Sequence, residues 1–392
     1  MTKKFKTSDI CKNIRKVVGK GIQKVHEPMV YGNEKKYLIN TIKQNFFSAG
    51  GNYVVKFEEK IKKITKAKYA IAVVNCTEAI HIALKACGIK RGDEVLVPSL
   101  TFIGTVNPIS YLGADPHFVE SNLDDFGIDC VKLEKYLSKI AIKKKNKLIN
   151  KNTKKTIKAI IPVHVFGHPC KIDDLMKIAK KYNLIIIEDA AAAMGSFYKK
   201  KHLGTFGIAG CISFNGNKIA TSGGGGVVIT NNKNLAKKIL HLSTTSKQKH
   251  KWEYLHDGVG YNLRMSNINA ALGLAQLENL KKFIKFKKNL YKKYNKAFKS
   301  FKEIRIFKEP KNSNSNYWLQ TLILDKKYSH LKDKILKETN KNFIFTRPAW
   351  KLISDSIPYK KSQKMLLPVA KEIYNRVINL PSSKKIVRNK FS

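Results

Sequence analysis

Three groups in this sequence stand where an apolar strand is expected to end. Asp189 ends the run LIIIEDA, Lys218 follows Ser213 by five residues, and Thr77-Glu78 opens a helical segment. A buried carboxylate needs a cationic partner, a lysine amine can form an imine, and free N–H groups at a helix start bind phosphate. Pyridoxal phosphate needs this combination, including an acid that keeps its ring nitrogen protonated. The sequence therefore predicts pyridoxal phosphate as cofactor.

Each of these residues also has an ordinary structural explanation. One lysine among 69 is most often a solvated side chain, and Asp189 alone could cap a helix or form an ion pair. The three groups occurring together favour the catalytic interpretation. Lys218 would need a lowered pKa to react as a free amine, which burial and nearby positive charge can supply.

Short β-rich runs alternate with helix-period segments over the first two thirds of the chain. The run LIIIEDA shows no polar alternation, which is typical of a strand covered on both faces in a parallel sheet. This rhythm predicts an α/β fold with an open, mostly parallel central sheet between helices. Ligands of such sheets bind beyond the carboxyl ends of the strands. We expect strands at 69–74, 92–98, 158–165, 184–190, 210–215 and 225–230.

The alternation of strand-like and helix-like segments changes near residue 260. Residues 266–298 read as one long amphipathic helix, or as two with a bend, and the basic segment 143–158 reads as a solvated loop. We expect an N-terminal arm over 1–30, a large cofactor-binding domain over 31–259 and a smaller α+β domain over 260–392.

Composition excludes several classes of protein. The formal net charge is +48, but only seven of the 76 basic residues are arginine, the residue that best grips bases and phosphates, so we expect no nucleic-acid role. No apolar run approaches a membrane span, and the N-terminus has no signal-peptide core. The six cysteines lack metal-site spacing and read as reduced thiols of a cytoplasmic protein. The run TSGGGG lacks the ending of a P-loop.

Longer motifs resemble one family. The segments KYAIAVVNCTEAIHIAL, GDEVLVPSLTFIGTVNPI, IIPVHVFGHPCKIDDL, IIIEDAAAAMGS, GTFGIAGCISFNGNK and GYNLRMSNINAALGLAQLE follow the order of the DegT/StrS-like sugar-nucleotide aminotransferases, which are fold-type-I pyridoxal-phosphate enzymes. The segments SNYWL, TRPAW and INLPSS resemble the aminotransferases of legionaminic-acid and related nonulosonate pathways.

The resemblance implies roles for individual residues. Lys218 would hold the cofactor covalently and later move the proton, Asp189 would pair with the ring nitrogen, and Phe102 would stack on the ring. The phosphate would be held by Ser213, by the amides of Thr77 and Glu78, and by Asn262 of a neighbouring subunit in a homodimer with shared sites. Arg264 and Arg347 are candidates for anionic parts of the substrates.

Three positions differ from the usual family pattern. Cys76 replaces a glycine, Glu78 replaces a small residue, and Ala192 replaces the Gln or Glu expected near the ring hydroxyl. Some relatives replace the lysine and dehydrate their substrates, and the presence of Lys218 argues against that branch.

The resemblance implies an aminotransferase that moves an amino group from L-glutamate to the C4 ketone of a UDP- or GDP-linked 2-acetamido-4-keto-6-deoxy sugar, for surface-glycan synthesis. Three alternatives stay open: a different keto-sugar (perosamine-type) or a different position, a cofactor-free regulatory or binding protein on the same fold, and nucleic-acid binding through surface lysines.

Overall fold

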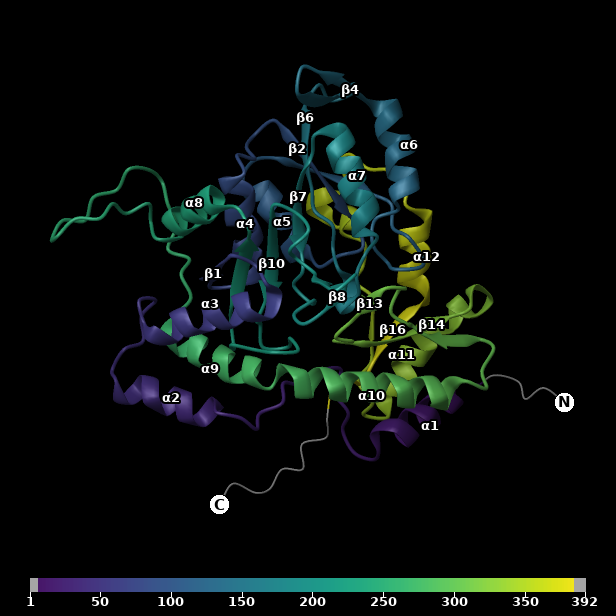
Figure 1. Cartoon of the computed structure of the whole chain (residues 1–392). Helices are drawn as coiled ribbons and strands as arrows, with labels where there is room; N and C mark the ends of the chain where they lie inside the picture. Colours follow the sequence, from purple (N-terminus) through teal and green to yellow (C-terminus); the bar gives the residue numbers. More distant parts are fainter. Residues whose placement is uncertain (1–5, 384–392) are drawn as a thin grey trace.

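The computed structural model describes residues 6–383, and its centre is a nine-stranded sheet with helices on both faces (Figure 1). The neighbours β10–β7, β7–β6, β6–β2 and β2–β3 are parallel, whereas β11 runs antiparallel between β1 and β10. Seven of its strands are, in spatial order, β1 (Tyr69–Val73), β11 (Gly226–Thr230), β10 (Ala209–Ser213), β7 (Ile185–Asp189), β6 (Thr156–Ile160), β2 (Asp93–Pro98) and β3 (Asp115–Val119). The other two, β4 (Ala141–Lys144) and β5 (Lys147–Asn150), form a hairpin that pairs with β6.

The sheet is covered on both sides because its side chains alternate between two apolar layers. Ile71 and Val73 of β1 pack in the layer of α4, and the intervening Ala72 packs in the layer of α3 and α9. The helices around the sheet are α2 (Glu34–Lys43), α3 (Asn52–Thr65), α4 (Cys76–Ala86), α5 (Ile103–Tyr111), α6 (Cys130–Ile140), α7 (Ile172–Tyr182), α8 (Lys233–Ser243) and α9 (Asn267–Glu278).

A smaller antiparallel sheet lies beside the first, among the C-terminal elements (Figure 1). The N-terminal helix α1 (Thr7–Val18) packs on this part of the molecule, with Ile10 and Ile14 fully buried. The elements are β12 (Ile304–Ile306), β14 (Gln320–Leu324), β15 (Arg347–Pro348), β16 (Val377–Leu380), α10 (Leu280–Phe298), α11 (Lys332–Lys341) and α12 (Pro368–Arg376). A short third sheet joins β8 (Phe197–Tyr198), β9 (Lys201–His202) and β13 (Ser313–Asn314).

These features confirm the predicted α/β architecture. Of the two alternatives predicted for residues 266–298, the structure has two helices, α9 and α10, which meet at Asn279. The domain limits at residues 30 and 260 stay a prediction; α9, beyond the second limit, packs on α2 and α3.

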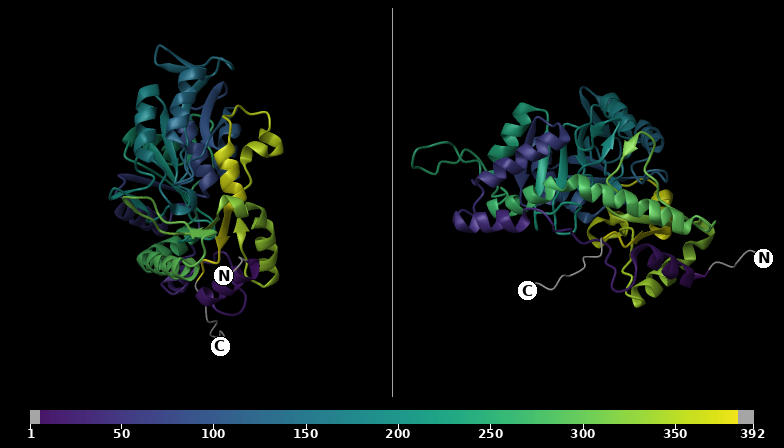
Figure 2. Two further views of the ribbon diagram at one scale, coloured as in Figure 1. Left: turned by 90° about the vertical axis from the view of Figure 1, so that its right-hand side faces the viewer. Right: turned by 60° about the horizontal axis from the view of Figure 1, so that its bottom comes forward.

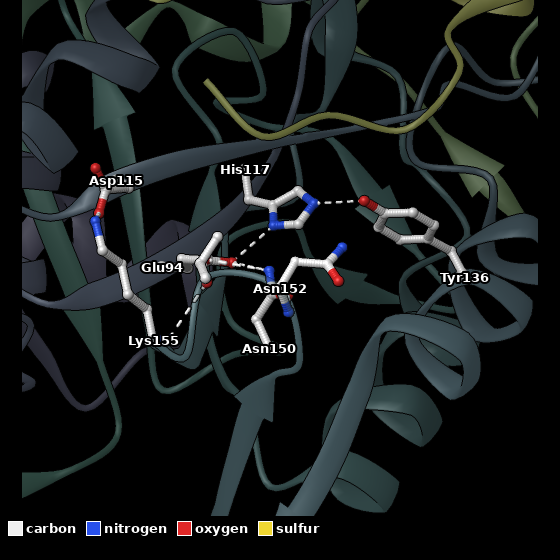
Figure 3. A network of polar contacts seen from close by, with 8 residues as sticks. Glu94, Asp115, His117, Tyr136, Asn150, Asn152 and Lys155 are labelled. Atoms are coloured by element: carbon white, nitrogen blue, oxygen red, sulfur yellow. Dashed lines mark hydrogen bonds and ion pairs between the residues drawn. The ribbon is translucent and has the colours of Figure 1, made fainter. Parts of the chain in front are cut away.

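The prediction of a solvated loop over 143–158 was wrong. The segment contains most of a hairpin, β4 (Ala141–Lys144) and β5 (Lys147–Asn150), and the start of β6, with which β5 pairs. The buried carboxylate of Glu94 anchors this hairpin, because it accepts a hydrogen bond from Asn150 Nδ2 (3.0 Å; Figure 3). It also accepts one from the hydroxyl of Thr153. His117 Nδ1 lies 2.8 Å from the same carboxylate, and its Nε2 lies 2.9 Å from the hydroxyl of Tyr136.

Among residues 6–383, no helix combines the length and the apolar character that crossing a membrane requires.

Candidate active site

The central sheet brings several chain segments to one edge. β7 and β10 are parallel neighbours, and β1 points the same way because it is antiparallel to β11, which is itself antiparallel to β10. Their carboxyl ends therefore meet, and a cavity of about 350 Å³ lies there. Six of the predicted site residues line it: Thr77, Phe102, Asp189, Ala192, Ser213 and Lys218.

Asp189 ends β7 with 5% of its surface exposed. Its Oδ2 accepts a hydrogen bond from the hydroxyl of Thr105 (2.6 Å), and its Oδ1 accepts one from the amide of Ala191 (2.9 Å). The hydroxyls of Thr105 and Thr101 are 2.7 Å apart, so a short chain of hydroxyls supports the carboxylate. These bonds fix the direction of the carboxylate while it lines the cavity, as an acid that pairs with a cationic ring nitrogen requires.

Lys218 lies in the turn between β10 and β11, and this half-buried residue lines the cavity. Burial lowers the pKa of Lys218, whereas Cys76 and Asp189 act in the opposite direction. The ring of Trp318 covers one side, with its centroid 4.0 Å from Lys218 Nζ. A lysine with a lowered pKa is available as a free amine at lower pH than a solvated lysine, which suits a nucleophile.

The N-terminus of α4 forms another wall of the cavity. Asn75 caps this helix by accepting a hydrogen bond from the amide of Glu78 (2.8 Å). The carboxylate of Glu78 pairs with His81 (2.9 Å), and Glu78 is not among the residues that line the cavity. The hydroxyl of Thr77 lies beside Gly104, where an added Cβ would come within 2.7 Å of it. A phosphate at this wall would accept hydrogen bonds from the hydroxyls of Thr77 and Ser213. The positive N-terminal end of α4 would attract its negative charge.

Two further predicted residues, Phe102 and Ala192, lie on the cavity wall. Phe102, which precedes α5, is 59% exposed. Ala192 is buried, and its carbonyl accepts a hydrogen bond from Asn316 (2.8 Å). The donor set therefore fits pyridoxal phosphate: an amine, a carboxylate, hydroxyl and amide donors, and an aromatic face.

Three predicted residues lie away from this cavity. Asn262 is exposed and lies at the base of a loop that projects from the molecule between α8 and α9. Arg264 forms an ion pair with Glu58 (2.8 Å) and donates to the carbonyl of Ala72 (2.8 Å). Arg347 lines a second cavity of about 620 Å³.

The second cavity adjoins the first, because Asn217, Trp318 and Trp350 line both. Its further lining includes the cationic side chains of Lys24, Arg347 and Lys351 and the aromatic rings of Phe166 and Phe345.

Sequence reasoning missed several residues of the site. Thr101 and Thr105 follow β2 at a spacing of four, and the rule that ligands bind beyond strand ends could have found them. Trp318 lies within the motif SNYWL, and Trp350 lies within TRPAW. Both motifs support the family resemblance, but that resemblance assigns no role to either tryptophan.

Comparisons with known proteins identify the family of the chain. Residues 29–391 match the model of the DegT/DnrJ/EryC1/StrS aminotransferase family. The chain is 38% identical over 367 residues to a GDP-perosamine synthase of Escherichia coli O157:H7, covering 91% of this chain and 92% of that protein. It is 35% identical over 359 residues to a GDP-perosamine synthase of Vibrio cholerae, covering 91% and 93%.

Among solved structures, Helicobacter pylori PseC, an aminotransferase involved in the biosynthesis of pseudoaminic acid, has the same fold. The TM-score is 0.82 at 24% identity, covering 92% of this chain and 94% of that chain. The match to the family model, together with relatives that cover nine tenths of the chain, settles the family. The chain belongs to the DegT/DnrJ/EryC1/StrS aminotransferase family and is a sugar aminotransferase that uses pyridoxal phosphate.

Proposed function

We propose that this enzyme transfers an amino group from L-glutamate to the C4 ketone of a UDP- or GDP-linked 2-acetamido-4-keto-6-deoxy sugar, in legionaminic-acid-type or related surface-glycan synthesis. The observation that carries the proposal is the convergence of Lys218 and Asp189 on one cavity beside a second, cationic cavity. The motifs SNYWL, TRPAW and INLPSS support the 2-acetamido sugar.

Several residues of the first cavity would have a defined task in this reaction. When bound, pyridoxal phosphate supplies an aldehyde that carries the amino group and a ring that accepts electron density. Asp189, fixed by Thr105, would face the ring nitrogen and keep it protonated. Lys218 Nζ would hold the cofactor and, as a free amine, would move a proton at the substrate carbon. Ser213 and Thr77 would hold the phosphate, and Phe102 would offer its ring to the cofactor.

The second cavity has the size and chemistry for the nucleotide part of the substrate. Arg347, Lys24 and Lys351 supply positive charge for a diphosphate, and aromatic rings offer faces for a base. Because Trp318 and Trp350 line both cavities, a sugar joined to the diphosphate can reach Lys218 from this side.

A perosamine-type reaction on a GDP-linked 4-keto-6-deoxy sugar without the acetamido group is the second candidate, and the names of the two curated relatives favour it. A panel of UDP- and GDP-linked 4-keto-6-deoxy sugars, with and without the 2-acetamido group, separates the candidates when each is assayed with L-glutamate. The first proposal predicts the higher kcat/KM for an acetamido sugar. A preference for the GDP-linked sugar without that group favours the second candidate, and no turnover of any C4 ketone contradicts both.

We also propose a homodimer with shared active sites. Figure 1 and the right-hand view of Figure 2 show the loop between α8 and α9 projecting away from the rest of the chain. The loop carries the exposed side chains of Trp252 (74%), Tyr254 (78%) and Val259 (85%), and Asn262 lies where it returns. A second copy of the chain would cover these apolar side chains and receive Asn262 at its cofactor phosphate.

Subunit mixing tests the shared sites. Lys218→Ala and Asn262→Ala homodimers each have defective sites, whereas a mixed dimer has one intact site. Random reassociation should therefore restore about a quarter of the wild-type activity. Mixing that restores no activity, in dimers shown to have exchanged subunits, contradicts shared active sites.

The six cysteines, all free thiols, support a cytoplasmic location.

A further inference from the structure

A lysine in the long helix α10 is fully buried without a carboxylate partner. Lys287 has 0% of its surface exposed, and none of the ion pairs among the described residues joins it to an Asp or Glu. Its Nζ donates to the carbonyl of Trp318 (3.0 Å), to the hydroxyl of Ser382 (2.7 Å) and to the carbonyl of Ser382. All three donors of the ammonium group therefore have acceptors, and burial lowers its pKa well below the usual value.

Such a lysine is a poor choice for stability alone. A buried charge without a counter-ion has a large desolvation cost, and an apolar side chain of similar length would fill the same space without it. The ammonium group holds two main-chain carbonyls, from different parts of the chain, in fixed positions. One of them belongs to Trp318, which lines both cavities.

Several polar groups of the segment around Trp318 are hydrogen-bonded. The amide of Trp318 donates to Asn316 Oδ1 (2.8 Å), and the indole N–H donates to the carbonyl of Asn217 (2.8 Å). Asn316 also donates to the carbonyls of Ala192 (2.8 Å) and Met194 (2.9 Å), in the segment that follows Asp189. The segment therefore ties together the loop after β7 and the turn that carries Lys218.

The backbone of this segment is strained. Tyr317 has a φ of 50°, in the left-handed region that a bulky side chain rarely adopts. A conformation of this kind persists only where the surroundings fix it on both sides. Asn316 fixes it on one side, and Lys287, through Trp318, fixes it on the other.

We propose that Lys287 is a positioning residue for Lys218: by anchoring the strained segment 316–318, it holds the ring of Trp318 against the reacting amine. The ring centroid lies 4.0 Å from Lys218 Nζ, and the indole bonds to the residue just before Lys218. The ring therefore excludes water from one side of the amine and limits the directions in which it can point. This inference rests on the proposed role of Lys218.

The substitution Lys287→Met tests the proposal, because methionine fills the space without bonding the two carbonyls. We expect amide hydrogen exchange in residues 315–319 of the cofactor-free protein to accelerate. We also expect covalent attachment of pyridoxal phosphate, followed by its visible absorbance band, to slow about tenfold or more, since small misplacements of reacting groups have effects of this size. The value of kcat should fall with little change in KM. Lys285→Met, at an exposed lysine of the same helix, is the matched control and should behave as wild type.

A second variant separates positioning from folding. Trp318→Leu removes the ring itself, and if Lys287 acts through Trp318, the double variant should attach cofactor no more slowly than Trp318→Leu alone. Wild-type exchange and attachment rates in Lys287→Met overturn the inference, and so do additive effects in the double variant. If Lys287→Met does not fold, the inference is tested with Trp318→Leu alone. A wild-type rate of cofactor attachment in the Trp318→Leu protein overturns the inference. Failure of the wild-type protein to attach cofactor would instead refute the proposed function.

Discussion

At the scale of single residues, the proposed cofactor binding depends on the hydrogen bonds that hold Asp189. Its carboxylate would be costly to bury without partners, and Thr105 supplies the shortest hydrogen bond to it (2.6 Å). Thr101 in turn supports Thr105 (2.7 Å). Removing the hydroxyl leaves a buried carboxylate oxygen with one donor fewer, which costs about 1–3 kcal/mol.

Thr105→Val should therefore weaken cofactor binding by about ten- to a hundredfold, since 1.4 kcal/mol is a factor of ten. Equilibrium dialysis of pyridoxal phosphate against the apoprotein measures this effect. Thr105→Ser keeps the hydroxyl and should bind nearly as wild type. Equal affinity of the valine variant and the wild type would show that Thr105 does not orient Asp189.

The sequence predicted some of these residues and not others for a physical reason. Asp189 and Lys218 stand out because a carboxylate after an apolar strand and a lysine near another strand end carry chemistry on their own. Thr105 and Trp318 have no chemistry until the fold supplies a partner, a carboxylate for one and an amine for the other. Their roles depend on contacts between segments distant in sequence, so periodicity could not reveal them.

At the scale of elements, strands and helices with strong periodicity were predictable and the basic hairpin was not. Half of the eight residues of β4 and β5 are lysine or asparagine, residue types that are depleted in strands. The hairpin forms because Glu94, buried at the start of β2, needs donors, and Asn150 (Figure 3) and Thr153 provide them. Although burial alone raises the pKa of Glu94, the hydrogen bonds hold that pKa below its usual value.

Glu94→Gln should destabilise the protein by about 1–3 kcal/mol, because the new amide places donors against donors. Denaturant unfolding measures the change, and hydrogen exchange should accelerate in residues 141–150 before the rest of the sheet. Lys155→Met, which breaks the neighbouring half-exposed pair with Asp115, serves as the control and should cost less than about 1 kcal/mol. An unchanged unfolding midpoint in Glu94→Gln would show that Glu94 does not anchor the β4–β5 hairpin.

At the scale of the whole molecule, buried neutral histidines make stability depend on pH. Burial lowers the pKa of His168 to about 3 and that of His202 to about 4. An unfolded chain protonates its histidines near pH 6.5. Between pH 6.5 and these lower values the unfolded state binds more protons than the folded state, so stability falls as pH falls.

We expect the free energy of unfolding to drop by about 1.4 kcal/mol per pH unit for each such histidine between pH 6 and pH 4. His168 packs between the rings of Phe307 (4.7 Å) and Tyr317 (5.0 Å), so His168→Phe should fit the site and remove its share of the slope. Urea unfolding across this pH range tests it. An identical slope in the variant would mean that His168 titrates normally in the folded protein.

The central claim is that one lysine among 69 carries the cofactor. Borohydride reduction of the enzyme loaded with pyridoxal phosphate, followed by peptide mass spectrometry, measures this directly. We expect a phosphopyridoxyl group on Lys218 and on no other lysine at stoichiometric yield. A protein labelled elsewhere, or an enzyme that still transfers amino groups as Lys218→Ala, would contradict it.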